Sequence, residues 1–140
     1  MPKVFNLGDI ATLVEAAATS NKKISRICLH EQTSVSPQEM MICHLQGSTD
    51  WPHRNNGNRI TLTIVEGTMS IVVFDDHGNV NQVFRLDRES GIISLQLEGH
   101  QYLSCIAESE YAILHEVIYG PWDEQKKDFY PGWARPRSSE

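Results

Sequence analysis

The sequence predicts an all-β domain, a sandwich or closed barrel of antiparallel strands, preceded by one short helix. Apolar residues recur with a period near 3.6 only close to the N-terminus, and the period changes to 2 after residue 23. The later segments are short, rich in Ile, Val, Leu, Tyr and Thr, and separated by turn signals rather than by helices. This even spacing favours a sandwich or barrel over a parallel sheet.

The length and composition fit one globular domain. The chain has 140 residues, of which 40% are hydrophobic and 21% charged, and a chain of this length buries roughly two-thirds of its unfolded surface. We expect three parts within this one domain: an N-terminal helical extension at 1–23, a β-barrel at 24–119, and a C-terminal tail at 120–140 that packs on the barrel through its aromatic residues. Those residues are Trp122, Phe129, Tyr130 and Trp133.

Charge and cysteine usage exclude several classes of protein. A net charge of −6 argues against a nucleic-acid surface, and the nearest basic cluster, Lys22, Lys23 and Arg26, is interpreted as an exposed loop. No apolar run approaches the roughly 18 residues that cross a bilayer, and no secretory leader is recognised. The three cysteines are odd in number and lie in apolar stretches, which predicts buried free thiols. The expected location is the cytoplasm.

The helix is predicted over residues 8–21. Its apolar residues fall at i, i+3, i+4 and i+7, the spacing of one helix face: Ile10, Leu13, Val14 and Ala17. Asp9 is predicted as the N-cap, and the Ser20-Asn21 pair as the end.

Eight strands are predicted after the helix. They span 24–29, 40–45, 59–65, 69–74, 82–86, 92–97, 102–107 and 111–118. Glu66-Gly67 and the segment 76–79 are predicted as tight turns, because Gly and Asn tolerate positive φ.

The stretch from Gly47 to Gly67 resembles the first sequence motif of the cupins, in which a Gly precedes His-x-His, a Glu and a second Gly. Two histidines at i and i+2 point the same way from a strand, and a Glu on a neighbouring strand completes one side of a metal site. In this sequence the first histidine is His53, the second position holds Asn55, and the Glu position falls on Ile60. The histidine of the second cupin motif falls on Tyr102.

The chain also resembles the WbuC family of cupin-fold proteins, often encoded in bacterial gene clusters for O-antigen and other surface polysaccharides. The resemblance runs from about Arg26 to Trp133 and rests on short elements in a common order. These elements are Leu29-His30, the run 38–41, Pro52-His53, Phe74-Asp75-Asp76 with Gly78, and Gly120-Pro121-Trp122 with Phe129 and Trp133. It implies a double-stranded β-helix (jelly-roll barrel) and a role in sugar metabolism, without a defined reaction.

The departures from the cupin pattern predict that the usual metal site is lost. A divalent ion requires three or four N, O or S ligands. Of the cupin ligand positions, only that of His53 keeps a ligating residue, so we expect no cofactor. A relocated divalent site from His53 and two of the other strand histidines, His44, His100 and His115, is the disfavoured alternative. The alternative without a metal is that these three are structural histidines in the core or at the rim, with their ring nitrogens satisfied by hydrogen bonds.

Two functions remain open. The first is binding of a small polar ligand in the barrel mouth, such as a sugar or sugar nucleotide, by His53, Asn55, His30, Trp51, Arg59 and Tyr102. The second is a cupin-type enzyme, a sugar isomerase or epimerase or a metal-dependent dioxygenase. If it is an enzyme without metal, His53 and Tyr102 are the predicted acid and base.

Two further expectations concern a buried charge and the assembly. Glu116 shares a strand face with Leu114 and Ile118, so it needs a partner if that face is inward, and Arg85 or a histidine are candidates. We also expect a homodimer, because pairing covers exposed sheet edges. No nucleic-acid or membrane partner is expected.

Overall fold

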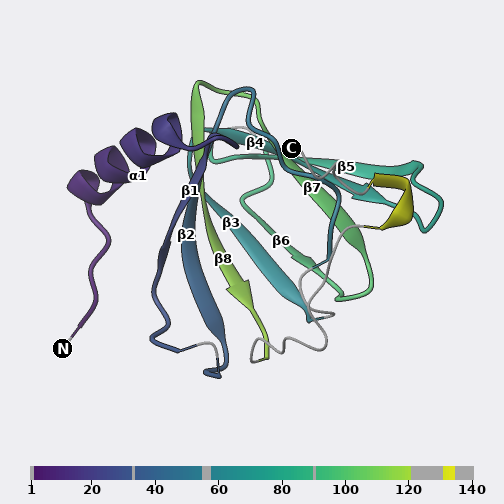
Figure 1. Ribbon diagram of the computed structural model, residues 1–140, viewed down its shortest axis with the longest axis horizontal. Helices are drawn as coiled ribbons and strands as arrows, with labels where there is room; N and C mark the ends of the chain where they lie inside the picture. Colours follow the sequence, from purple (N-terminus) through teal and green to yellow (C-terminus); the bar gives the residue numbers. More distant parts are fainter. Residues whose placement is uncertain (1, 33, 55–57, 90, 121–130, 135–140) are drawn as a thin grey trace.

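Two antiparallel sheets face each other in the computed structural model, which describes residues 2–32, 34–54, 58–89, 91–120 and 131–134. The larger sheet has the strand order β1-β2-β8-β3-β6 and the smaller one β5-β4-β7 (Figure 1). The bounds are β1 Ile24–Cys28, β2 Gln38–Leu45, β3 Ile60–Glu66, β4 Thr68–Phe74, β5 Val80–Asp87, β6 Ser94–Leu97, β7 Tyr102–Ala107 and β8 Tyr111–Ile118. All eight predicted strands are present, and each boundary lies within two residues of the prediction.

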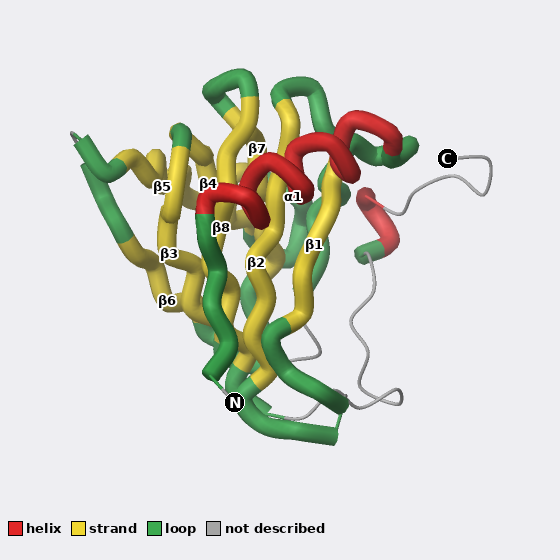
Figure 2. Tube along the Cα trace, turned by 90° about the vertical axis from the view of Figure 1, so that its left-hand side faces the viewer, coloured by secondary structure: helices red, strands yellow, loops and turns green. Residues whose placement is uncertain are grey.

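The helix α1, Leu7–Thr19, begins one residue earlier than predicted. Its N-cap is Asn6 rather than Asp9, and Asp9 instead occupies the third helical position, where it completes a capping box with Asn6. This arrangement satisfies two backbone N–H groups that the start of a helix leaves free. Figure 2 shows α1 lying across the outer face of the larger sheet, where Leu13 and Ala17 pack against Met41, Cys43 and Ile113.

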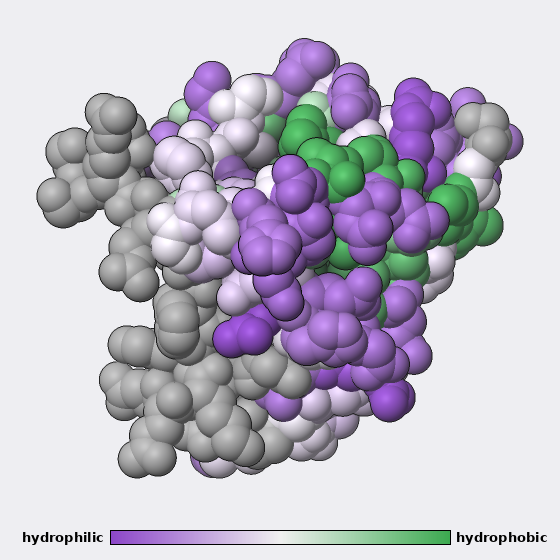
Figure 3. All heavy atoms as spheres, turned by 90° about the vertical axis from the view of Figure 1, so that its right-hand side faces the viewer, coloured by the Kyte–Doolittle hydropathy of each residue, from purple (hydrophilic) through white to green (hydrophobic). Residues whose placement is uncertain are grey.

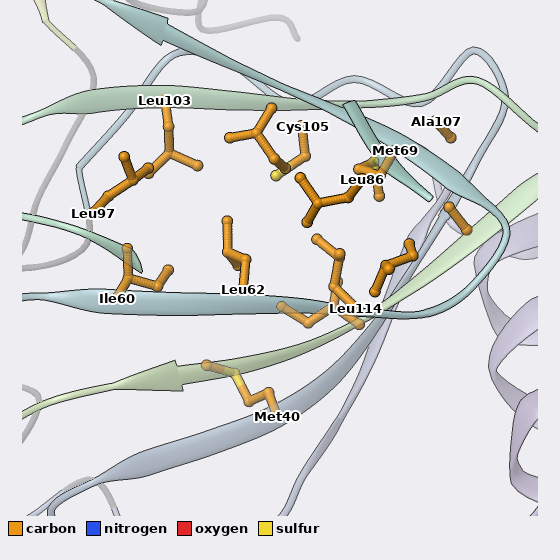
Figure 4. Close-up of a cluster of buried hydrophobic side chains, with 14 of the residues drawn as sticks. Met40, Ile60, Leu62, Met69, Leu86, Leu97, Leu103, Cys105, Ala107 and Leu114 are labelled. Carbon is orange, nitrogen blue, oxygen red and sulfur yellow. The ribbon is translucent and has the colours of Figure 1, made fainter. Parts of the chain in front are cut away.

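The main core fills the space between the two sheets. Inward-facing residues alternate along every strand, as the period of 2 predicts. Figure 4 shows the apolar side chains of both sheets pointing toward one another, among them Ile60, Leu62, Met69, Leu86 and Leu103. Ile60, which occupies the carboxylate position of the cupin motif, is 2% exposed, and such burial of an apolar side chain contributes about 1.5–3 kcal/mol.

Two single β-bridges lie at the two edges of the smaller sheet. On one side Leu86 of β5 pairs with Ile92, and on the other His53 pairs with Leu103 of β7. The strand β1 forms the remaining edge of the larger sheet and packs mainly against β2 and α1. Its Cys28 is therefore exposed, which corrects the prediction of three buried thiols; Cys43 and Cys105 are buried.

The C-terminal residues that the structure describes dock on the hairpin between β4 and β5. The Trp133 indole N–H donates to the carbonyl oxygen of Asp76 at 2.9 Å, and its ring contacts those of Phe74 and Tyr102 at centroid distances of 5.4 and 5.7 Å. Gly78 in the predicted turn has a φ of 90°. The other aromatic anchors, Trp122, Phe129 and Tyr130, lie outside the described residues.

Figure 3 shows apolar side chains gathered within a mainly polar face of the molecule. The most exposed apolar residues of the smaller sheet are Val80 and Val83 on β5 and Ile106 on β7. Within the described part of the chain, no helix has both the length and the apolar character needed to cross a membrane.

Candidate functional site

A cavity of about 550 Å³ opens between the edge strand β1 and the smaller sheet. Its walls come from the inward faces of β1, β2 and β8, from the segment 49–53 and from β7. The apolar part includes Met40, Ile42, Leu62, Leu103 and Leu114, several of which appear in Figure 4. The volume lies in the range of small-molecule sites.

Strand register brings the polar lining residues together. Arg26 on β1 pairs with Ile42 on β2, which in turn pairs with Leu114 on β8. Two residues before Ile42 on β2, Met40 pairs with Glu116 of β8. Two residues after Ile42, His44 pairs with Ala112. Since alternate residues share a face, Arg26, His44 and Glu116 all face the cavity.

The segment 47–53 runs beside β7 and closes part of the opening. The backbone of His53 exchanges two hydrogen bonds with Leu103, at 3.0 and 2.8 Å. The Asp50 carboxylate accepts the Cys105 backbone N–H at 2.7 Å, and the Ser104 hydroxyl donates to the Asp50 carbonyl. These bonds hold Asp50 and His53 against the edge of the smaller sheet.

His53 has a defined ring orientation. Its Nδ1 lies 2.7 Å from the carbonyl oxygen of Trp51, which can only accept, so Nδ1 carries the proton. The same nitrogen lies 3.6 Å from a carboxylate oxygen of Asp50. In the neutral ring Nε2 is therefore an acceptor. His53 and Trp51, both predicted ligand-binding residues, line the cavity.

His44 and Glu116 are buried polar side chains that face the cavity. His44 is 4% exposed, and its Nδ1 has no hydrogen-bond partner among the described residues. Burial lowers the pKa of His44. Glu116 is 7% exposed, and burial, partly offset by His53 and Arg26, raises its pKa to about 7. The expectation of a hydrogen-bonded core histidine is therefore wrong for His44 Nδ1.

The partner expected for Glu116 is not Arg85. Arg85 lies on β5 and forms an ion pair with Asp87 at 3.6 Å. The charged groups that act on Glu116 are His53, Arg26 and Asp50. Arg26 is exposed, as interpreted from the sequence, but it lies on strand β1 rather than in a loop.

The other predicted ligand-binding residues are divided between the cavity and the outside. His30 lines the cavity, and its Nδ1 lies 3.1 and 3.2 Å from the backbone oxygen and nitrogen of Glu39. Arg59 is exposed and lies 3.8 Å from Glu98, and it does not line the cavity. Asn55 lies outside the described residues.

Tyr102 does not join His53 in the cavity. Leu103 and Cys105 are the residues of β7 that line it, so Tyr102 lies on the opposite face of that strand. Its ring packs against Trp133 and carries the Arg54 guanidinium 5.0 Å above its centre. The predicted pairing of His53 with Tyr102 as acid and base is therefore not formed.

The side chains present do not fit the cupin metal site. Ile60 is a core residue and Tyr102 faces outward, so two ligand positions cannot contribute. His100 is exposed, and His115 lies on the outer face of the sheet, 3.1 Å from Glu39. Of the three strand histidines, His44 is the one that lines the cavity with His53. Among the described residues, no three His, Cys, Asp or Glu side chains are grouped as a metal ion requires.

Sequence reasoning missed Asp50 and the place of Arg26. Arg26 could have been found, because alternation along the predicted strand 24–29 puts it on one face with Ile24 and Cys28. Asp50 lies in a segment without periodicity. Its position depends on pairing with β7, more than fifty residues away in the sequence.

Known proteins support the fold. A family model described as a domain of unknown function (DUF6016) matches residues 5–86, more than half of the chain. Solved structures that resemble this one include protein SO0799 from Shewanella oneidensis, with a TM-score of 0.63 and 8% identity over 91% of this chain and 85% of that one. KdgF from Halomonas sp. has a TM-score of 0.57 and 13% identity over 73% and 83%.

A third similar structure is described as a cupin domain. The cupin domain of Cnp3 from Schizosaccharomyces pombe has a TM-score of 0.55 and 13% identity over 74% of this chain and 70% of that one. The two-sheet architecture and these likenesses confirm the predicted jelly-roll barrel of cupin type. No curated protein matches the sequence.

Proposed function

The chain belongs to the family described as a domain of unknown function (DUF6016), and from its cavity we propose that it binds a small polar ligand inside a cupin barrel without a metal ion. One observation carries this proposal: His44 Nδ1 is buried beside an open cavity without a hydrogen-bond partner among the described residues, and the buried Glu116 lines the same cavity. A buried polar group without a partner costs about 1–3 kcal/mol. A ligand with hydroxyl groups would remove that cost, since hydroxyls both donate and accept.

The binding test is a panel of neutral and acidic sugars and polyols at millimolar concentration, followed by the shift in Tm. The variant is His44→Phe, which replaces the imidazole with an apolar ring. The matched control is His100→Phe, at an exposed histidine outside the cavity. We expect at least one compound to raise the Tm of the wild type and of the control but not of His44→Phe. No binding by any compound, or binding that survives His44→Phe, would overturn the proposal.

Metal independence has a separate test. The protein is exposed to Zn²⁺, Ni²⁺, Mn²⁺ and Fe²⁺, passed through a desalting column and analysed for bound metal. We expect substoichiometric metal in the wild type and in His53→Ala alike, because a divalent ion needs three or four ligands and no three His, Cys, Asp or Glu side chains among the described residues are grouped to supply them. One equivalent of an ion that is lost in His53→Ala would refute a metal-free site.

An enzymatic role is a second candidate, favoured by one observation. Glu116, whose pKa is raised to about 7, shares the cavity with the Nδ1-protonated ring of His53. A carboxyl group with a pKa near the working pH is suited to general acid–base catalysis. This role predicts exchange of the C–H next to the carbonyl of fructose in D₂O, followed by NMR. It requires that Glu116→Gln and His53→Asn both abolish the exchange, and no exchange by the wild type would count against it.

The biological setting proposed from the WbuC resemblance is surface-polysaccharide metabolism in the cytoplasm. The shared elements near the site, such as Leu29-His30 and Pro52-His53, support it because His30 and His53 both line the cavity. Neighbouring genes for glycosyltransferases would support this setting. A genomic context without any polysaccharide gene would contradict it.

The assembly proposed is a homodimer. Strand β1 is an unpaired edge of the larger sheet, and such edges are commonly covered by pairing. Light scattering is expected to give twice the chain mass of 15.9 kDa. A mass of one chain at micromolar concentration would rule the dimer out.

A further inference from the structure

Arg26 is an exposed cation that lines the open side of the cavity. It lines the cavity from β1, and the structure places no hydrogen bond or ion pair on its side chain within the described residues. Its charge nevertheless acts on both buried groups, since it lowers the pKa of Glu116 and of His44. Arg26 is thus placed to meet a charge that enters the cavity.

Neither carboxyl group that lines the cavity within the described residues, Asp50 or Glu116, forms an ion pair with Arg26. Asp50 is engaged with the Cys105 backbone N–H and lies beside His53. Glu116 is held toward its neutral form by burial, and a neutral carboxyl group can donate a hydrogen bond as well as accept one. The second cation, Lys22, is exposed at the mouth. The cavity therefore offers one guanidinium at its open side and uncharged polar groups deeper inside.

The pairing register of β1, β2 and β8 determines how long a ligand must be to contact both Arg26 and Glu116. Arg26 and Glu116 lie on strands separated by β2 and are offset by two residues. The Cα atoms of the two residues are therefore roughly 10 Å apart across the sheet and roughly 7 Å apart along it. The long arginine side chain brings its guanidinium closer to Glu116 than these separations. On β2, between the two residues, lie Ile42 and Met40, an apolar surface suited to the carbon chain of a ligand.

Resting on the proposed function, we infer that the ligand is a small polyhydroxylated carboxylic acid whose carboxylate pairs with Arg26 and whose hydroxyls reach His44 and Glu116. One guanidinium matches one carboxylate through two parallel hydrogen bonds. The hydroxyl groups supply the hydrogen-bond partner that His44 Nδ1 lacks among the described residues and can also bond the Glu116 carboxyl group. A neutral sugar would leave the guanidinium to water, so the carboxylate is what adds affinity at this position.

Matched pairs of probes isolate the carboxylate. Gluconate is compared with glucitol, and glycerate with glycerol, by isothermal titration calorimetry and saturation-transfer NMR. The test variant is Arg26→Gln. The control is Arg85→Gln, which removes the same charge from β5, where Arg85 pairs with Asp87 outside the cavity.

We expect gluconate to bind at least tenfold more tightly than glucitol to the wild type and to Arg85→Gln. Arg26→Gln should lose at least tenfold in gluconate affinity and leave glucitol unchanged. Equal binding of each pair, or gluconate binding unaffected by Arg26→Gln, would overturn this inference. If glucitol binds as well as gluconate and His44→Phe abolishes both, the inference fails while the proposed function stands. If none of the four probes nor any other panel compound binds, both fail.

Discussion

His44 on β2 and Glu116 on β8 face one cavity from neighbouring strands, and the buried His44 Nδ1 has no hydrogen-bond partner among the described residues. Folded proteins satisfy nearly all of their buried polar groups. The unpartnered His44 nitrogen destabilises the unliganded protein, and its place beside an open cavity indicates that a bound ligand supplies the missing hydrogen bond.

Replacing His44 with Phe is expected to stabilise the unliganded protein by about 1 kcal/mol, because it removes a buried nitrogen without a partner. The cavity gives the larger ring space to settle. Chemical denaturation measures the change, with His100→Phe as the control at an exposed position. A loss of stability in His44→Phe would mean that the imidazole contributes to the fold rather than to a ligand site.

Glu116 predicts a pH dependence of stability. Burial raises its pKa from 4.5 to about 7, so between these values the unfolded chain has lost a proton that the folded protein keeps. The free energy of unfolding therefore falls as the pH rises from about 4.5 to about 7. At about 1.4 kcal/mol per pH unit, the fall is at most about 3 kcal/mol.

In Glu116→Gln this component of the fall disappears, and the variant gains stability relative to the wild type as the pH rises. Urea unfolding between pH 4 and 8 measures it, with the exposed Glu108→Gln as the control. Parallel curves for wild type and Glu116→Gln would refute the buried neutral carboxyl group.

Asp50 is predicted to hold the segment 47–53 on β7. Removing its carboxylate in Asp50→Ala leaves the Cys105 N–H without its acceptor, and loss of a hydrogen bond to a charged group costs about 2 kcal/mol. Hydrogen exchange of the Cys105 amide should accelerate as well. Asp76→Ala, at an exposed turn, is the control, and an unchanged Cys105 exchange rate would contradict the assignment.

Gly78 is predicted to be required for docking of the C-terminal residues. A Cβ at this position would lie 2.8 Å from the Trp133 ring, and φ is +90°. Gly78→Ala should therefore cost about 1–2 kcal/mol and shift the Trp133 indole resonance in NMR. At Gly132 an added Cβ meets nothing within 4 Å, so Gly132→Ala should leave both unchanged. An unshifted resonance in Gly78→Ala would show that Trp133 does not need this contact.

Much of the fold and part of the site follow from periodicity. The alternation of apolar residues located all eight strands, and the same alternation put Glu116 on one face with Leu114 and Ile118. Tyr102 shows the limit of this reasoning. Its assignment to a ligand position required a register exact to one residue, and a shift of one residue moves a side chain to the other face of the strand.

Local spacing and turn chemistry are enough to predict a β-barrel with one capped helix, because they specify which segments form strands and where they end. The alignment with the cupin motif puts Asn55, Ile60 and Tyr102 at ligand positions, which is a matter of residue identity alone. The grouping of Arg26, His44, Asp50, His53 and Glu116 around one cavity could be seen only in the folded chain. Those residues come from four separate segments, and their meeting depends on strand pairing across long stretches of chain, which no local pattern encodes.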